Sequence, residues 1–389
     1  MTDVKFETRE IGSLAKPPWR VKAFAGRPIE EGDVAEAERW AQKLGLDDTE
    51  ELVETLRRDE LGKDDLRLID DWSARYGLAL LERAGLDIVY DGEQRRIEMY
   101  DHVVRHARGF EQRGTIRSFD NKYYSKAAVV EEPSIDGPYD VDEYRFLAAR
   151  TDRRLKAPFT GPYTIVDWSY DEHYGRHGAL GATAEQRADA RRRFLLDVAE
   201  HVVRPNAAAV VEAGCDWIQI DEPALSTRPD EVPYGVEAFN ASVAGIPSQR
   251  RSLHICFSDY TKLFPHVLQL DDCFELQLEF ANRDSHELGT DGADRPGYEA
   301  LFLFADNEDA PNVGLGVVDI HTNFVEPAEL VRDRVIYAAE LLGPERISVN
   351  PDCGLRTRSW DVSYEKLANM VEGTRLAEEA LNRAHAGSR

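Results

Sequence analysis

The chain has 389 residues, of which 42% are hydrophobic, and a formal net charge of −25 at pH 7. Its length suits one large barrel-type domain or two medium ones. The negative charge argues against nucleic acid or an anionic membrane as a partner, because both are polyanions. No stretch approaches the roughly 20 apolar residues that span a bilayer, and the N-terminus lacks the apolar core of a signal peptide. We therefore expect a cytoplasmic protein with no nucleic-acid or membrane partner.

Short apolar runs that end in polar residues recur along the chain. They lie at residues 10–13, 87–93, 157–162, 217–222, 253–256, 276–279, 313–321 and 347–353. Amphipathic segments such as residues 187–213, 327–342 and 363–385 predict helices between and after them. Eight strand-and-helix units in one chain predict an α/β protein with a single (β/α)₈ TIM barrel.

Two further segments add to this predicted barrel. Residues 30–85 are expected to be mostly helical and to flank it. Residues 115–132 alternate apolar and polar side chains, which predicts a hairpin within an insert over residues 115–150, before the third strand. We find no linker rich in Pro or Gly, so residues 1–389 are expected to form one catalytic domain.

Polar and metal-binding residue types end seven of the eight runs. They are Ser13, Glu93, Asp221, Cys256, Glu279, His321 and Cys353. In a (β/α)₈ barrel the active site lies where the strands end. The pattern therefore predicts a site built from several loops at one mouth of the barrel.

Four of the residues near strand ends form a plausible metal-binding set. His254 and Cys256 are two residues apart on a predicted strand, so their side chains point to the same side. Together with Glu279 and Cys353 they offer two thiolates, one imidazole and one carboxylate, a tetrahedral set suited to Zn²⁺. Taken alone, the His-x-Cys pattern is a weak signal, because it more often reflects a buried cysteine beside an ordinary hydrogen-bonded histidine.

A zinc ion would give this set a specific chemistry. Free thiols are mostly protonated at neutral pH, whereas a bound metal deprotonates a coordinated thiol and makes it a nucleophile. The other two cysteines, Cys215 and Cys273, each precede a predicted strand, and we expect them to be ordinary packing residues.

Several sequence motifs follow one another in a characteristic order. They are Ile11-Gly12-Ser13, Gly92-Glu93, residues 160–165 with Trp168, residues 218–225, His254-Ile255-Cys256, Leu278-Glu279, residues 316–321 and residues 349–355. Through them the chain resembles the C-terminal catalytic half of cobalamin-independent methionine synthases along nearly its whole length. It is similar to the short "core" form that lacks the N-terminal barrel of that family.

The resemblance implies roles for these residues. The zinc ligands would be His254, Cys256, Glu279 and Cys353. The residues that bind homocysteine would be Ile11, Ser13, Glu93 and Asp221, with the two acidic side chains receiving the ammonium group. His321 would give a proton to the leaving group of the methyl donor, Asp319 would orient His321, and Trp168 would pack on the donor.

The chain departs from the family on the donor side. After Asp-Glu-Pro-Ala-Leu the family has Arg-Glu, whereas this chain has Ser226-Thr227. The family's Arg-Cys step before the third strand has no counterpart, and Glu131 and Glu132 in that region would repel a polyglutamate tail. We therefore expect a zinc-dependent methyltransferase that converts homocysteine to methionine, with a methylcorrinoid or corrinoid protein as donor rather than methyl-folate.

Three alternatives remain open at this stage. One is a folate-using methionine synthase. Another is a zinc alkyltransferase for a different thiol, like the epoxyalkane:coenzyme M transferases, although a sulfonate substrate would favour Arg or Lys over Glu93 and Asp221. The third is a zinc-binding protein without turnover, against which Asp319 and His321 argue because a pure binder needs no proton donor.

Overall fold

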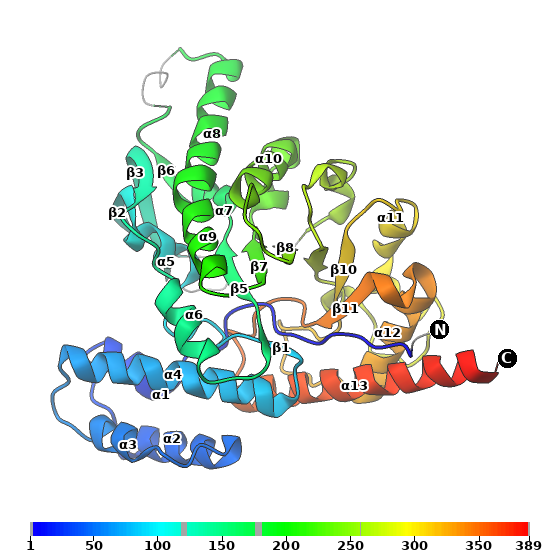
Figure 1. Cartoon of the computed structure of the whole chain (residues 1–389), viewed down its shortest axis with the longest axis horizontal. Coiled ribbons are helices and arrows are strands. Elements are labelled where there is room, and N and C mark those ends of the chain that lie inside the picture. The colour runs from blue at the N-terminus through cyan, green and yellow to red at the C-terminus, as the bar shows by residue number, and fades with distance from the viewer. Residues whose placement is uncertain (1–2, 118–122, 176–180, 257, 388–389) are drawn as a thin grey trace.

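A parallel six-stranded sheet lies at the centre of the molecule (Figure 1). The computed structural model describes residues 3–117, 123–175, 181–256 and 258–387. The sheet has the order β11-β10-β9-β8-β7-β5. Its strands are β5 (Ala157–Thr160), β7 (Trp217–Asp221), β8 (Arg250–Ile255), β9 (Glu275–Leu278), β10 (Asn312–Gly316) and β11 (Ile347–Asn350). Nearly all of their residues are buried, as expected for parallel strands covered on both faces. These six strands confirm six of the eight predicted runs.

Of the first two predicted strands, one is absent at the predicted residues and the other is much shorter than expected. β1 (Ile88–Val89) pairs in parallel with β4 (Arg154–Leu155), just ahead of β5. Single bridges join Thr8 to β11 and Arg9 to β1. The prediction of a strand at residues 10–13 was wrong.

Side chains rather than a neighbouring strand bind the backbone of this segment. The carbonyl of Ile11 accepts hydrogen bonds from Lys156 Nζ at 2.9 Å and Gln219 Nε2 at 2.7 Å. The fold is therefore α/β with one large parallel sheet and smaller sheets. A closed eight-stranded barrel is not confirmed within the described residues.

The predicted hairpin before β5 is present and longer than expected. β2 (Ala107–Arg117) pairs antiparallel with β3 (Tyr123–Ile135), and β6 (Tyr170–Asp171) adds in parallel to β3. Residues 118–122, inside the predicted hairpin, lie outside the described residues. The hairpin stands beside α8 (Ala184–Val198) at the upper left of Figure 1.

The N-terminal flanking segment is helical, as predicted. It contains α1 (Pro18–Phe24), α2 (Glu31–Leu44), α3 (Glu50–Leu56) and α4 (Lys63–Ala84). The long C-terminal helix α13 (Trp360–Gly387) runs beside α4 (Figure 1). Trp360 at its start packs edge-on against Trp40 of α2, with 5.3 Å between the ring centroids.

The remaining helices connect successive strands. They are α5 (Met99–His106), α6 (Val141–Ala148), α7 (Pro162–Asp167), α9 (Arg204–Glu212), α10 (Val232–Val243), α11 (Leu301–Ala305) and α12 (Ala328–Leu342). One turn of π-helix, Ala199–Val203, joins α8 to α9, so the predicted helix over residues 187–213 is one continuous helical run. Short 3₁₀ turns lie at Leu225–Thr227, Pro229–Glu231, Tyr260–Lys262, His266–Gln269, Ala281–Arg283, Pro296–Tyr298 and Pro344–Arg346. No helix in the described segments is long and apolar enough to cross a membrane.

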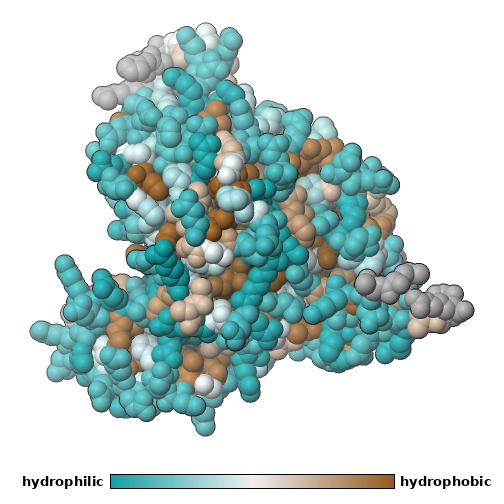
Figure 2. Space-filling view, viewed as in Figure 1, coloured by the Kyte–Doolittle hydropathy of each residue, from teal (hydrophilic) through white to brown (hydrophobic). Residues whose placement is uncertain are grey.

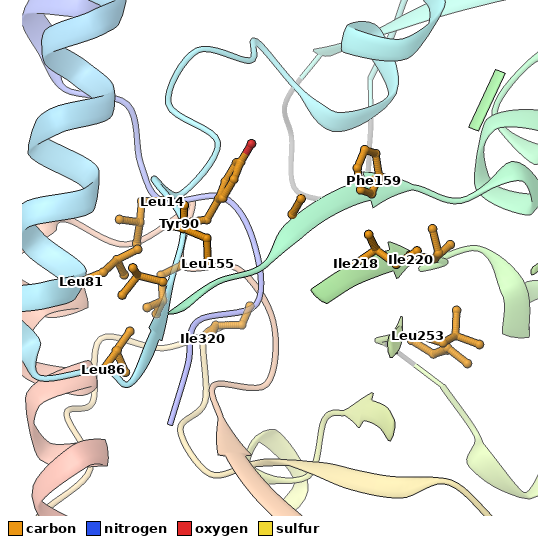
Figure 3. Close-up of a cluster of buried hydrophobic side chains, with 14 of the residues drawn as sticks. Leu14, Leu81, Leu86, Tyr90, Leu155, Phe159, Ile218, Ile220, Leu253 and Ile320 are labelled. Carbon is orange, nitrogen blue, oxygen red and sulfur yellow. The ribbon is translucent and has the colours of Figure 1, made fainter. Parts of the chain in front are cut away.

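Buried apolar side chains link the helical flank to the sheet. In Figure 3, Leu81 of α4 lies beside Leu14 and Leu155, while Ile218 and Ile220 lie farther along the sheet. All of these side chains belong to the same buried cluster. The surface seen in Figure 2 is mainly hydrophilic, with hydrophobic residues grouped towards the middle of the face. The flank and the sheet therefore share one hydrophobic core.

Candidate functional site

Three of the four predicted metal ligands meet at the carboxyl ends of β8 and β11. One ligand atom from each of His254, Cys256 and Cys353 lies within 4.8 Å of the others. His254 Nε2 is 3.3 Å from Cys353 Sγ. His254 and Cys256 are buried, and Cys353 is half-buried. The i and i+2 spacing on β8 brings the first two together, and the parallel arrangement of β8 and β11 brings in the third.

The neighbouring strand orients the His254 ring. Its Nδ1–H donates to the backbone carbonyl of Gln277 on β9, at 3.0 Å. A carbonyl oxygen only accepts, so this contact leaves Nε2 directed at Cys353. Metal-binding histidines are commonly fixed through their second nitrogen in this way.

The two thiols and the imidazole perturb one another strongly. Burial alone would lower the pKa of His254, but the neighbouring Cys353 raises it to about 9. A hydrogen bond from Cys256, together with His254, lowers the pKa of Cys353 to about 5. The same hydrogen bond and burial raise the pKa of the Cys256 thiol. The three side chains therefore form one electrostatically linked group.

The donor set fits zinc. Tetrahedral zinc has Zn–S distances of about 2.3 Å and Zn–N distances of about 2.0–2.1 Å, which separates neighbouring ligand atoms by about 3.5–3.8 Å. The 3.3 Å distance between His254 Nε2 and Cys353 Sγ is close to this separation, and the atoms of the whole group lie within 4.8 Å of one another. Two thiols and an imidazole are also the ligand types that zinc prefers.

Glu279 and His321 lie side by side next to this group. Glu279 directly follows β9 and is fully buried, and its Oε1 is 3.6 Å from His321 Nε2. The contact with Glu279 raises the pKa of His321. Asp319 accepts the backbone N–H of His321 at 2.7 Å, so it fixes the turn that carries the ring. Glu279 is not among the three residues of the close group.

Asp352 ties two of the site loops together, and sequence reasoning missed this role. Its carboxylate accepts three backbone N–H groups of residues 280–282, at 2.7–3.0 Å. These residues follow Glu279, while Asp352 itself precedes Cys353. A Cβ on Gly316 would lie 2.2 Å from Asp352 Oδ1, so this position requires glycine. In the sequence, Asp352 is visible as an acidic residue between an apolar run and Cys353. Its hydrogen-bond partners are about 70 residues away, so the sequence does not indicate them.

Glu93 is held in an unusual backbone conformation. Its φ is 57°, the left-handed region that non-glycine residues rarely adopt outside functional or strained sites. Its N–H donates to Asp91 Oδ1 at 2.7 Å, and the hydroxyl of Ser13 donates to its Oε2. Burial alone would raise the pKa of Glu93, but Arg96 and Lys16 outweigh burial and lower it. The carboxylate is therefore buried and ionised.

Asp221 and Ile11 share one hydrogen-bond donor. The side-chain amide of Gln219 donates to Asp221 Oδ1 and to the Ile11 carbonyl, each at 2.7 Å. Burial raises the pKa of Asp221 to about 7. The carboxyl end of β7 is thus linked directly to the Ile11–Ser13 segment.

Ser13 lies against the residue that follows Cys353. A Cβ on Gly354 would meet Ser13 N at 2.8 Å and Ser13 O at 2.9 Å, so the two backbones are in contact. The structure therefore brings the predicted homocysteine residues next to the predicted metal ligands.

Glu222 anchors the helix that precedes Trp168. Its carboxylate accepts the N–H of Tyr163 at 2.8 Å and of Thr164 at 2.7 Å, at the start of α7. Trp168 follows α7 and packs edge-on against Tyr100, with 6.1 Å between the ring centroids. The part of Trp168 in donor binding stays a prediction.

The other two cysteines behave as packing residues. The Cys215 thiol donates to the Trp217 carbonyl at 3.1 Å, and the Cys273 thiol donates to the Glu275 carbonyl at 3.4 Å. Neither belongs to the close group.

A buried group of two thiols and an imidazole, at the carboxyl ends of parallel strands, defines a candidate metal centre in an α/β protein. Comparison with known families agrees with this class: residues 47–376 match the model described as "Cobalamin-independent synthase, Catalytic domain". The chain belongs to this family. It is a methyltransferase of the methionine synthase type, which places it in methionine biosynthesis.

Relatives that align with nearly the whole chain are named methionine synthase. The methionine synthase of Thermoplasma acidophilum is 35% identical over 373 residues, covering 94% of this chain and 96% of the relative. That of Pyrococcus furiosus is 31% identical over 380 residues, covering 97% and 94%.

A solved structure shares the fold. It is a B12-independent methionine synthase from Shewanella sp. W3-18-1 in complex with selenomethionine, with a TM-score of 0.72 and 22% identity. The match covers 97% of this chain and 99% of that one. At this identity the likeness shows the fold alone.

Proposed function

We propose that the chain methylates the thiol of homocysteine to give methionine, with Zn²⁺ held by His254, Cys256, Glu279 and Cys353. The observation that carries this proposal is the close group of His254, Cys256 and Cys353 at the ends of two strands. A bound zinc ion would supply the acidity that turns the substrate thiol into a thiolate nucleophile. The family of the chain supports homocysteine methylation as the reaction.

The residues of the chain would bind and orient the amino-acid end of the substrate. Glu93 and Asp221 are buried carboxyl groups that can receive an ammonium group. Ser13 contacts both Glu93 and the residue after Cys353, and Gln219 links the Ile11 carbonyl to Asp221. The Shewanella protein was solved with selenomethionine, the selenium counterpart of the proposed product, which supports an amino-acid ligand. A coenzyme M-like sulfonate finds no support here, because a buried ionised Glu93 would repel it.

His321 would supply the proton to the departing donor. Its side chain is 31% exposed, so it can exchange protons with solvent, and imidazole is the side chain suited to proton transfer near neutral pH. Asp319 holds the backbone of this turn in place. A protein that only binds zinc would have no use for such a group.

The methyl donor needs a direct test. The expectation of a methylcorrinoid gains no support from the comparisons, because a cobalamin-independent family points to a folate. Ser226, where the family has Arg, accepts a 2.6 Å hydrogen bond from Ser258, whose hydroxyl contacts the carbonyl of Cys256. The altered position therefore lies close to the metal group. We take methyl-folate as the first donor to test. Methylcorrinoid is the alternative donor, which the presence of Ser226 in place of the family's Arg favours.

We also propose that residues 1–389 form one (β/α)₈ barrel domain. The bridges of Thr8 to β11 and of Arg9 to β1, with the pairing of β1 and β4, support closure of the sheet between β11 and β5. The TM-score of 0.72 to the Shewanella protein covers nearly the full chain, which supports one domain rather than two.

The experiment is a donor-by-thiol assay of the zinc-loaded protein. Homocysteine is offered with methyl-folate or with methylcobalamin, and methionine is measured by mass spectrometry. We expect methionine from homocysteine with at least one donor. Absence of methionine with both donors, together with alkylation of another thiol such as coenzyme M, would overturn the proposal.

A further inference from the structure

A buried arginine lies three residues after Glu93, in the loop that follows β1. Arg96 is only 3% exposed. Its Nη2 is 2.7 Å from Glu143 Oε1 and 3.6 Å from Asp140 Oδ1, and its Nη1 donates to the Pro158 carbonyl at 2.9 Å. A guanidinium is planar and permanently charged, so these three contacts fix the direction of the whole group.

The partners of Arg96 are themselves fixed. Asp140 Oδ1 lies 2.7 Å from His102 Nε2, and Asp140 Oδ2 accepts a 2.7 Å hydrogen bond from Asn206 Nδ2. Glu143 belongs to α6, and Pro158 belongs to β5. Contacts with Pro158 of β5, with Glu143 of α6 and with Asp140 thus hold Arg96 in place, and none of them involves Glu93.

The remaining side of Arg96 faces Glu93. Arg96 Nη1 lies 3.8 Å from Glu93 Oε1. This is beyond hydrogen-bond distance, whereas Ser13 binds the other oxygen directly. Arg96 therefore contributes its charge without occupying Oε1. A Cβ on Gly12 would come within 3.6 Å of that oxygen, so the substrate-binding segment passes beside it.

We propose that Arg96 is a positioning residue that holds the Glu93 carboxylate ready for an ammonium group, and so makes the enzyme prefer thiols that carry an α-amine. This inference rests on the proposed function of Glu93 in homocysteine binding. In this proposal Arg96 acts through Glu93 and does not contact the substrate.

The charge of Arg96 also widens the pH range in which Glu93 is ionised, together with Lys16, the Ser13 hydroxyl and Arg356. Arg96 is the largest of these influences, which lower the pKa of Glu93 against the effect of burial. Without it that pKa rises, so Glu93 becomes protonated at a higher pH. Binding of the ammonium group then fails at a higher pH as the solution is made acidic.

Arg96→Gln and Arg96→Lys test this role in the zinc-loaded enzyme. We compare homocysteine with 4-mercaptobutanoate, which is homocysteine without its amine. In Arg96→Gln we expect the KM for homocysteine to rise by about tenfold or more, with little change in kcat or in the KM for 4-mercaptobutanoate. Arg96→Lys keeps the charge and recovers part of the loss. The acid limb of kcat/KM for homocysteine moves to higher pH in Arg96→Gln.

Arg95→Gln is the matched control. Arg95 precedes Arg96 but binds Asp71 of α4 at 2.6 Å, so this variant should keep the wild-type preference. Zinc content and circular dichroism report whether each variant is folded. Should Arg96→Gln fail to fold, the same comparison is made with Arg96→Lys.

Equal loss for both thiols, or an unchanged preference for homocysteine, would overturn the inference. The wild-type enzyme reports separately on the proposed function. If it turns over no homocysteine, the proposed function fails; if it does and Arg96→Gln keeps the preference, only the role of Arg96 fails.

Discussion

Cys353 and Cys215 are two cysteines of one sheet with opposite surroundings. The Cys353 thiol faces His254 and Cys256, whereas the Cys215 thiol donates to a backbone carbonyl in a buried position. Of these two cysteines, Cys353 has neighbouring side chains that can bind an ion together with it, and Cys215 does not. The proposed role in metal binding therefore applies to Cys353.

The substitution Cys353→Ser should therefore remove the metal. We expect the variant to lose bound zinc and at least ~100-fold of kcat/KM, because it lacks one of the two sulfur ligands. The matched variant Cys215→Ser should keep both. Metal content by mass spectrometry, measured with activity, checks this expectation. Stoichiometric zinc in Cys353→Ser would show that the ligand set is wrong.

His321 separates metal binding from proton transfer. Its ring touches Glu279 but is not one of the proposed ligands. The substitution His321→Gln should keep zinc and the KM for homocysteine, and should lower kcat by ~10²–10⁴, the usual worth of a general acid. Steady-state kinetics with metal analysis decides this. Loss of zinc in the variant would assign His321 to the metal shell instead.

At the level of elements, the loop after β9 and the loop after β11 form one unit through Asp352. Three backbone N–H groups of residues 280–282 depend on this carboxylate, and β10 passes so close that Gly316 has no room for a side chain. The proposed ligands Glu279 and Cys353 lie at the start of these two loops, so the distance between them depends on this junction.

The substitution Gly316→Ala tests the junction. The added Cβ would overlap Asp352 Oδ1, so we expect unfolding free energy to fall by about 1–3 kcal/mol, and zinc affinity to fall with it. Gly32→Ala in α2 is the control, because a Cβ there meets nothing within 4 Å, and it should stabilise the protein by about 0.4–1 kcal/mol. Urea denaturation and zinc titration measure both. Unchanged zinc affinity in Gly316→Ala would mean that the junction does not shape the metal site.

For the whole molecule, one large apolar core provides most of the packing. This cluster joins the sheet to the helical flank, and of the proposed metal ligands Cys353 packs against it. The fold should therefore survive without an ion, although the proposed zinc ion would stabilise the folded state by binding to it.

Removal of zinc with a chelator should lower the melting temperature without unfolding the chain at 25 °C. Binding to the folded state alone stabilises by about 4 kcal/mol at a free ligand concentration a thousand times Kd. Scanning calorimetry and far-ultraviolet circular dichroism, before and after chelation, measure this. A chelated protein without secondary structure would show instead that the ion is required for folding.

The sequence allowed prediction of elements whose pattern is local. Buried strands, the helical flank and the hairpin each have a periodicity, and the polar residues at strand ends stand out against apolar runs. The segment at residues 10–13 was wrongly predicted as a strand because its Ile11 carbonyl is bound by two side chains from distant strands. Asp352 and Arg96 were missed for a similar reason, since their partners are far away in the sequence.

The start of the chain is secured by its last helix. Asn382 of α13 binds both the N–H and the carbonyl of Val4, at 2.8 and 3.1 Å, and Glu378 accepts the N–H of Phe6 at 2.7 Å. The Ile11–Ser13 segment follows directly from this anchor. Synthesis on the ribosome therefore separates the parts of the proposed amino-acid pocket in time: Glu93 and Asp221 are made long before α13, whose Asn382 and Glu378 hold the backbone that leads to Ile11 and Ser13.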